Sequence, residues 1–329
     1  MENNNKNLLS VEDVKLYFYG AEKVSKVLNG ISYAVKRGET VCLVGESGCG
    51  KTVSALTVMG LIPQPPGKIM GGKVFFKGTN LLDLDEVEMQ KIRGNRIGMV
   101  FQEPMTSLNP VLTIGDQIGE AVMLHEKKDW HDALTRSVDL VREVGIPSPD
   151  NIIDQYPHQL SGGQRQRIMI AMALACNPEL VIADEPTTAL DVTIQAQILK
   201  LFNQLQEKRH MSLIYITHDL GVVASIADRI YIMYGGLIFE HGTREDILYN
   251  SRHPYTRGLL ASLPDRSKRG TTIHSIPGTV PDPSRTLSGC PFHPRCTFSV
   301  DDCRSLFPEL CDYGNGHVSR CPVLFAQEK

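Results

Sequence analysis

The residues with the clearest capacity for chemistry lie in one glycine-rich segment, Gly45-Glu-Ser-Gly-Cys-Gly-Lys51-Thr52, which fits the pattern G-x-x-x-x-G-K-[ST]. Gly48 and Gly50 let the backbone curl so that successive N–H groups face phosphate oxygens, and a helix that begins here adds the positive end of its dipole. In this pattern the lysine reaches the β- and γ-phosphates and the threonine hydroxyl binds Mg²⁺. The segment therefore predicts a phosphate-binding loop made by Gly45, Glu46, Ser47, Gly48, Cys49, Gly50, Lys51 and Thr52.

A second group of candidate residues follows the apolar run Leu180–Ala183. Asp184 stands where an acid can orient the shell of a bound Mg²⁺, and Glu185 beside it can polarise an attacking water as a general base. Two acids at the end of a strand could also be no more than solvated surface groups. The phosphate-binding loop in the same chain favours the catalytic interpretation.

Each of these groups must be positioned by a buried strand. The apolar runs Thr40–Val44, Leu180–Ala183 and Leu213–Thr217 are short and alternate with helical patterns, which predicts an α/β fold with buried parallel strands. The three runs end at the glycine-rich loop, at the acid pair and at His218. Open α/β sheets bind their ligands at this end of the strands, so we expect the three groups to serve one site.

The chain divides into two predicted domains. Residues 1–250 carry the strands and motifs, with a mostly helical insertion at about 103–160. Residues 251–329 are rich in proline and cysteine and poor in apolar periodicity, which predicts a loop-rich appendage with too small a core to fold alone. One helical stripe between the last two strands is assigned to core packing: Ile194, Ile198, Leu201, Phe202 and Leu205.

Composition and charge narrow the function classes. The formal net charge of −3 argues against a binder of nucleic-acid backbones, which would show a concentrated basic excess. The N-terminal residues 1–7 lack the basic start and apolar run of a secretory signal, and no apolar stretch is long enough to cross a membrane. The sequence predicts a cytosolic protein that reaches a membrane only through a partner.

The segment Leu160-Ser-Gly-Gly-Gln164 indicates which class of phosphate-binding protein this is. Its serine and two glycines stand before a helix, which predicts a second helix N-terminus that can bind an anion. With it, the chain strongly resembles the ATP-binding-cassette (ABC) ATPases, whose signature is this pentapeptide. The other elements of that family appear in order over about residues 8–250. They are a Q-loop glutamine at Gln102, Walker B acids at Asp184 and Glu185, a D-loop at Ala189-Leu-Asp191 and a switch histidine at His218.

The resemblance implies a RecA-like core, an antiparallel β subdomain, a helical subdomain and a head-to-tail dimer that sandwiches ATP. Ser161 and Gly163 would contact the γ-phosphate bound to the partner, with Gln164 and Asp191 as further nucleotide-binding candidates. By the same resemblance, Gln102 would sense Mg²⁺ and the attacking water, His218 would hold the γ-phosphate, and Phe18 would stack on adenine, with Tyr17 and Tyr19 as its neighbours.

The C-terminal region indicates which branch of the ABC ATPases the chain resembles. His253–Leu260, Ile276–Pro281 and Cys290–Cys296 resemble the tail of oligopeptide and dipeptide importer ATPases, although nickel importers share much of it. This implies a subunit that hydrolyses ATP on the cytoplasmic side of the cell membrane to power peptide import. Its partners would be a paralogous ATPase or a second copy, two transmembrane permease subunits and, indirectly, an extracytoplasmic peptide-binding protein.

Two alternative functions stay open at this point. The chain could serve an importer of nickel or another small solute. It could also be a non-transport ABC ATPase with a redox-sensitive tail, although such proteins tend to carry two cassettes or a long coiled coil. This chain has one phosphate-binding loop and no heptad run between its motifs, which disfavours the second alternative.

Five of the eight cysteines crowd the tail. Structural zinc sites usually begin with a tight C-x₂₋₄-C pair, and none is present. Irregular spacing favours a [4Fe–4S] cluster, which members of the resembled branch can carry, with zinc second and free thiols third. We treat Cys311 as a non-ligand and assign His293 and His317 to turn packing in preference to metal binding. The predicted ligands are Cys290, Cys296, Cys303 and Cys321.

Overall fold

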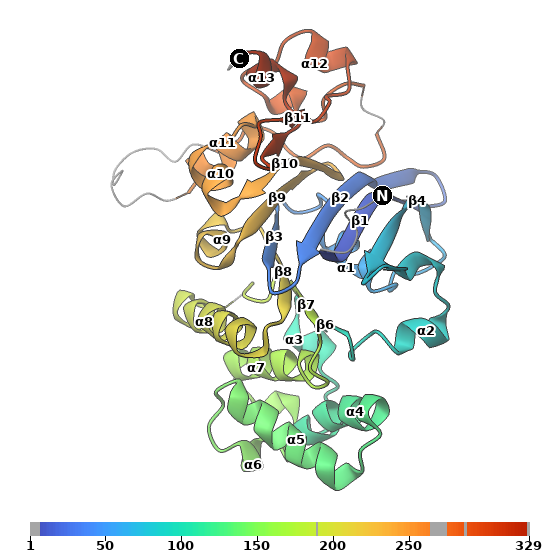
Figure 1. The fold of residues 1–329 in the computed structure, drawn as a ribbon, viewed down its shortest axis with the longest axis vertical. Helices are drawn as coiled ribbons and strands as arrows, with labels where there is room; N and C mark the ends of the chain where they lie inside the picture. Colours follow the sequence, from blue (N-terminus) through green and yellow to red (C-terminus); the bar gives the residue numbers. More distant parts are fainter. Residues whose placement is uncertain (1–6, 189, 264–274, 286–287, 328–329) are drawn as a thin grey trace. The chain divides into compact units, whose positions relative to one another are not determined.

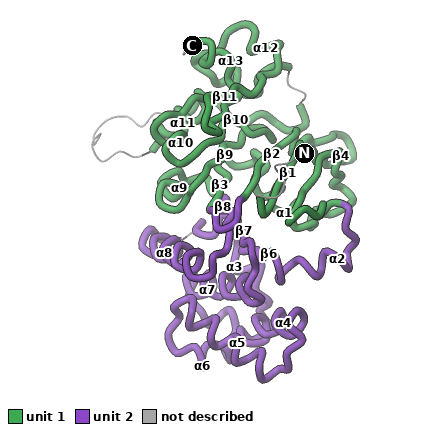
Figure 2. Tube along the Cα trace, viewed as in Figure 1, with its two compact units in different colours: residues 1–35, 40–82, 217–329 green, residues 36–39, 83–216 purple. Residues whose placement is uncertain are grey.

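The computed structural model describes residues 7–188, 190–263, 275–285 and 288–327. The chain forms two compact units, shown in different colours in Figure 2. The first unit comprises Met1–Val35, Thr40–Leu82 and Thr217–Lys329, and the second comprises Lys36–Glu39 and Asp83–Ile216. The predicted alternation of buried strands with helices is confirmed in both units (Figure 1).

The first unit contains a four-stranded sheet in the order β2-β1-β4-β5. Strands β1 and β4 run antiparallel, with Leu9 opposite Phe76 and Leu16 opposite Ile69. Alternate residues of β1, such as Leu9 and Val11, are buried, as expected of a sheet that packs one face on a core. The strands are β1 (Asn7–Tyr19), β2 (Val24–Lys36), β4 (Gly67–Phe76) and β5 (Thr79–Asn80).

A second run of strands in the first unit has the order β11-β12-β10-β9-β3. Strand β3 pairs in parallel with β9, and β9 turns back into β10 through Gly235-Gly236, both with positive φ, as a tight hairpin requires. All five residues of β3 are buried, which explains its continuous apolar sequence. The strands are β3 (Thr40–Val44), β9 (Arg229–Tyr234), β10 (Leu237–Thr243), β11 (Cys311–Asp312) and β12 (Val318–Ser319).

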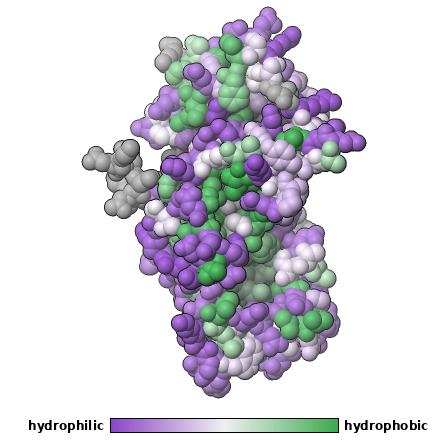
Figure 3. All heavy atoms as spheres, turned by 90° about the vertical axis from the view of Figure 1, so that its right-hand side faces the viewer, coloured by the Kyte–Doolittle hydropathy of each residue, from purple (hydrophilic) through white to green (hydrophobic). Residues whose placement is uncertain are grey.

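The helices of the first unit are short. Figure 1 shows α10 and α11 beside β10, and α12 and α13 near the C-terminus. The described part of the chain exposes several apolar side chains here, among them Phe298, Leu306 and Phe307, and Figure 3 shows hydrophobic patches among hydrophilic atoms. The helices are α1 (Lys51–Val58), α9 (Leu220–Ile226), α10 (Arg244–Tyr249), α11 (Pro254–Ala261), η4 (His293–Arg295), α12 (Asp302–Ser305) and α13 (Pro322–Gln327), with η1 (Leu81–Asp83) at its edge.

The second unit pairs β6, β7 and β8 in parallel, with β7 in the middle. All residues of β7 and β8 are buried, because helices cover them. Figure 1 shows α4 and α5 side by side. The elements are β6 (Ile97–Val100), β7 (Leu180–Asp184), β8 (Ser212–Thr217), α2 (Glu86–Gln90), α3 (Pro104–Ser107), α4 (Ile114–Glu126), α5 (Trp130–Glu143), α6 (Pro149–Ile152), η2 (Pro157–Gln159), α7 (Gly162–Ala173) and α8 (Val192–Arg209).

Local sequence explains where the longer helices begin and which face they bury. Helix α4 starts at a capping box, in which Thr113 and Asp116 each accept a hydrogen bond from the other's backbone N–H. Helix α8 buries Ile198, Leu201, Phe202 and Leu205, four of the five residues in the predicted stripe. Among the described residues, no helix is long and apolar enough to cross a membrane.

Candidate nucleotide-binding site

The phosphate-binding loop links β3 to α1 in the first unit, in the predicted strand–loop–helix order. Gly48 and Gly50 adopt φ of 79° and 104°, a left-handed conformation that glycine takes without strain. At Gly45 a Cβ would lie 2.2 Å from the carbonyl oxygen of Met233, so the start of the loop has room only for glycine. The backbone thus has the curl that a cradle for phosphates needs.

The lysine of this loop is buried and folded back on the loop itself. Lys51 is 5% exposed, and its Nζ donates hydrogen bonds to the carbonyl oxygens of Gly45 at 2.7 Å and Glu46 at 3.1 Å. Cys49 is also buried, and burial raises the pKa of its thiol, so this cysteine stays protonated near neutral pH. A buried ammonium at a helix start provides strong positive potential for an anion.

The second unit brings the acid pair together with Gln102. Asp184 ends β7 and is 2% exposed. Glu185 follows it with φ of 45°, a left-handed conformation that is strained for a residue with a side chain. Its carboxylate Oε2 accepts hydrogen bonds from Nε2 of Gln102 at 3.4 Å and from the hydroxyl of Thr188 at 3.0 Å. The two contacts place the carboxylate of Glu185 beside the amide of Gln102.

The segment Leu160–Gln164 forms the beginning of α7 in the second unit. Ser161 is the N-cap, and its hydroxyl accepts from the N–H of Gln164 at 3.3 Å while Oε1 of Gln164 accepts from the N–H of Ser161 at 2.9 Å. Ser161 and Gly162 are exposed, and Gly163 packs close to Ile194. Helix α7 is twelve residues long, and its capped start is accessible. The backbone N–H groups there are suited to contact a phosphate.

Tyr17, which the sequence analysis named only as a neighbour of Phe18, lines a pocket beside the phosphate-binding loop. Tyr17 shares a pocket of about 190 Å³ with Gly48, Asn29 and Gly236. Phe18 approaches Gly67 instead, where its ring would lie 3.2 Å from a Cβ added to that glycine. Side chains alternate across a strand, so neighbouring aromatics on β1 face opposite sides. This alternation is the signal that could have separated the two residues.

Two family models match the chain. The model described as "ABC transporter" matches residues 28–188, and that described as "Oligopeptide/dipeptide transporter, C-terminal region" matches residues 239–303. A probable peptide ABC transporter ATP-binding protein of Sinorhizobium fredii is 50% identical over 95% of this chain and 94% of its own length. The chain belongs to the ABC transporter ATP-binding proteins.

Further relatives agree with this membership. The dipeptide transport ATP-binding protein DppD of Bacillus subtilis is 48% identical over 95% of this chain and 94% of its own length. Among solved structures, the ATP-binding cassette MJ0796 in a dimeric post-hydrolysis state bound to ADP and Pi has a TM-score of 0.65 at 28% identity, covering 72% of this chain and 98% of its own. The predicted ABC fold is therefore confirmed.

The predicted site residues of this ABC ATP-binding protein fall into both units. The first unit holds the Walker A loop with Thr52 at the start of α1, Phe18 on β1, and His218, which is exposed just before α9. The second holds Gln102, the Walker B acids, the signature and Asp191, which caps α8 by accepting from the N–H of Ile194 at 2.9 Å. Ala189, in the predicted D-loop, lies outside the described residues.

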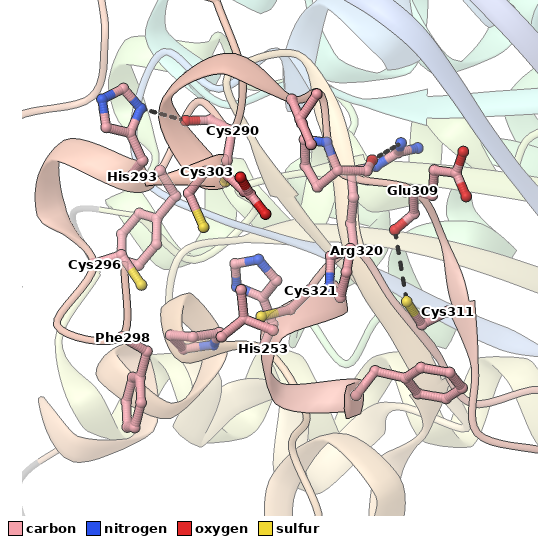
Figure 4. Close-up of a pocket in the computed structure, with 18 of the residues that line it drawn as sticks. His253, Cys290, His293, Cys296, Phe298, Cys303, Glu309, Cys311, Arg320 and Cys321 are labelled. Carbon is pink, nitrogen blue, oxygen red and sulfur yellow. Dashed lines mark hydrogen bonds between the residues drawn. The ribbon is translucent and has the colours of Figure 1, made fainter. Parts of the chain in front are cut away.

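The C-terminal extension of this ABC protein, predicted as residues 251–329, carries in its described part a pocket of about 940 Å³ that all five tail cysteines line (Figure 4). Burial, with a smaller contribution from neighbouring thiols of the group, raises the pKa of Cys290 and of Cys321 to about 11. The same two causes raise the pKa of Cys296. Every pair among Cys290, Cys296, Cys303 and Cys321 is close enough for such a mutual effect.

Cys311 is placed differently in this pocket. Its thiol faces the carbonyl oxygen of Glu309 at 3.9 Å, and Figure 4 shows it on the far side of the pocket from Cys296. In the described part of the chain no three His, Cys, Asp or Glu side chains are close enough together to hold a metal ion as they stand. The iron–sulfur cluster and its zinc alternative stay predictions.

Proposed function

We propose that this protein is the ATP-hydrolysing subunit of an importer for dipeptides and oligopeptides. The observation that carries the proposal is the contact between Gln102 and Glu185, because it assembles a water-orienting amide and a general base beside the buried Asp184. Relatives that are about 50% identical over nearly the whole chain bear peptide-transport names, which supports the peptide cargo over nickel.

Each predicted residue has a role in this proposal. Lys51 and the loop N–H groups bind the β- and γ-phosphates. The hydroxyl of Thr52 and the carboxylate of Asp184 are hard oxygen ligands of the kind that Mg²⁺ prefers. Mg²⁺, when bound, would neutralise the charge that develops on the phosphates. Glu185 accepts the proton of the attacking water, and Gln102 orients that water.

The proposal also includes a second ATPase subunit. Ser161, Gly163 and Gln164 at the start of α7, with Asp191, would contact the nucleotide held by that subunit, and His218 would hold its own γ-phosphate. Hydrolysis is then gated by closure, because neither subunit has a complete site alone. We expect the ATPase pair to be peripheral to the membrane, bound to two permease subunits, and to receive peptide from an extracytoplasmic binding protein. The domain division at about residue 250 belongs to the same proposal.

The test is peptide uptake in cells that carry this chain in place of their own copy. Uptake of a radiolabelled dipeptide and uptake of nickel are measured for the parent and for Lys51→Ala, which removes the phosphate-binding ammonium. We expect Lys51→Ala to abolish dipeptide uptake and to leave nickel uptake unchanged. Loss of nickel uptake alone would contradict the peptide assignment, and unchanged uptake of both would contradict the ATPase role.

We propose further that the extension holds a [4Fe–4S] cluster, with zinc as the alternative. Four half-buried thiols that share one pocket form a soft sulfur donor set, which suits iron–sulfur clusters. Such a group would fix a segment that has little apolar core of its own. Anaerobically purified protein should contain about four irons and four sulfides per chain and absorb broadly in the visible range. Stoichiometric zinc without iron would contradict the cluster and leave a structural clip.

A further inference from the structure

Glu46, the second residue of the phosphate-binding loop, is held at three points within the first unit. Its carboxylate accepts hydrogen bonds from Nη1 of Arg295 at 3.0 and 3.1 Å. Its N–H donates to the hydroxyl of Tyr255 at 3.0 Å, and its carbonyl oxygen accepts from Nζ of Lys51 at 3.1 Å. Arg295 lies 249 positions later in the sequence, so the C-terminal extension reaches the loop directly.

Arg295 is itself tightly fixed. Its side chain is 6% exposed, and its Nε donates to the carbonyl oxygen of Pro277 at 2.8 Å. The guanidinium lies over the rings of Tyr234 and Phe292, 5.7 and 5.9 Å from their centroids. A buried guanidinium requires a counter-charge, and the Glu46 carboxylate provides it. The ion pair is therefore a built feature of the fold and not a chance contact of two mobile side chains.

The electrostatics of the loop give this ion pair a consequence for nucleotide binding. A carboxylate on a loop that must accept a triphosphate repels the ligand, and the repulsion is strong where water is partly excluded. The positive charge of Arg295 offsets the negative charge of the Glu46 carboxylate, and Nη1 donates a hydrogen bond to each of its oxygens. Lys51, whose Nζ lies 3.1 Å from the carbonyl oxygen of Glu46, then contributes its positive charge to the loop without an opposing net charge on the Glu46 side chain.

We propose that Arg295 is a positioning residue for nucleotide binding, which acts by neutralising and holding the carboxylate of Glu46. The inference rests on the proposed ATPase function and adds a contribution of the extension to ATP affinity. Arg295 ends the short turn η4, which lies between Cys290 and Cys296. The conformation of the turn between Cys290 and Cys296 therefore determines where the Arg295 guanidinium lies relative to the phosphate-binding loop.

The experiment compares Arg295→Met, Glu46→Gln and the double variant by equilibrium binding of a fluorescent ATP analogue and by steady-state ATPase assays. Arg295→Met leaves an uncompensated carboxylate, so its Kd should rise roughly tenfold at low salt, which corresponds to about 1.4 kcal/mol of repulsion between that carboxylate and the phosphates. Glu46→Gln should unfold at a lower temperature, because Arg295 loses its counter-charge, but the folded variant should bind at least as tightly as the parent, since no carboxylate faces the nucleotide. The double variant should return close to the parental Kd, because neutrality is restored.

Two readouts separate this role from a merely structural one. The increase in Kd of Arg295→Met over the parent should become smaller at high salt, because salt screens the repulsion. The kcat of Arg295→Met at saturating ATP should stay close to the parental value. Arg304→Met, at an exposed arginine of the same extension, is the matched control and should bind like the parent. Thermal unfolding of each variant shows whether it is folded.

The proposal is overturned if Arg295→Met binds like the parent, or if the double variant is as weak as Arg295→Met at every salt concentration. If Arg295→Met does not fold, the Kd of Glu46→Gln tests the proposal by itself. Weaker ATP binding by Glu46→Gln than by the parent would contradict the electrostatic role. Failure of the ATPase function looks different. In that case the parent itself would not hydrolyse ATP, or would do so no faster than Lys51→Ala.

Discussion

Glu185 is the residue on which hydrolysis should depend most directly. Replacing it with glutamine keeps the size of the side chain but removes the proposed base, while the backbone and the contact with Gln102 can persist. We expect kcat of Glu185→Gln to fall by roughly 10²-fold or more, the range seen when a general base is lost. ATP should still bind, so size-exclusion chromatography with ATP should show a trapped dimer.

Glu207→Gln is the control, because Glu207 is an exposed acid on α8 in the same unit. It should hydrolyse ATP at the parental rate. Hydrolysis at the parental rate by Glu185→Gln would show that the base is another residue.

Tyr17 and Phe18 provide a matched test of where adenine stacks. The geometry favours Tyr17, because it lines the pocket that contains Gly48, whereas Phe18 approaches Gly67. Tyr17→Leu should weaken nucleotide binding by about 1–3 kcal/mol, the usual worth of a base stacked on an aromatic ring. Phe18→Leu should lower stability and leave affinity nearly unchanged. Isothermal titration with ATP and with triphosphate distinguishes the two variants, and the reverse result would restore Phe18 to the role.

The link from β3 to α1 has no room for a side chain at its first residue. Gly45 has no room for a Cβ, because the carbonyl oxygen of Met233 would lie 2.2 Å from it. We expect Gly45→Ala to displace the loop and to abolish ATPase activity, since misplacement by about 1 Å can cost 10²-fold in rate. Gly71→Ala is the matched control, because a Cβ added to Gly71 on β4 meets no other atom within 4 Å. Normal activity in Gly45→Ala would mean that the loop tolerates a shift.

Sequence reasoning worked well for elements whose signal is local. The phosphate-binding loop, the strand before Asp184 and the buried stripe of α8 follow from spacing along short segments. The contact of Gln102 with Glu185 joins residues 83 positions apart, and Arg295 meets Glu46 across 249 positions. No periodicity in the chain encodes such pairings. The two-residue strands β11 and β12 were also beyond prediction, because alternation needs about four residues to be recognised.

At the scale of the whole molecule, half-buried His241 on β10 should make stability sensitive to acid. Burial, aided by Arg229 and His317 and opposed by Asp312, lowers the pKa of His241 to about 4 from the usual 6.5. The unfolded chain therefore takes up a proton first as the pH falls below 6.5, and the free energy of unfolding decreases until about pH 4. The loss from this residue should be up to about 2 kcal/mol.

His241→Phe removes the titrating group and keeps a ring against Tyr231, whose centroid is 5.0 Å away. Urea unfolding at pH 7 and pH 4.5 should show a smaller loss of stability for His241→Phe than for the parent. His131→Gln, at an exposed histidine on α5, should behave like the parent. Equal losses for His241→Phe and the parent would exclude His241 as the cause.

The pairing of β10 with β12 has a practical consequence for anyone who shortens this protein. Glu240 on β10 is fully buried and accepts hydrogen bonds from the N–H groups of Arg252 and His253, with Nε2 of His317 2.8 Å away. A truncation after residue 250 would strip all three partners from a buried carboxylate and leave β10 without its partner strand at Glu240 and His241. Because unpaired strand edges recruit other chains, we expect the shortened protein to be less stable and more prone to aggregation than the full chain.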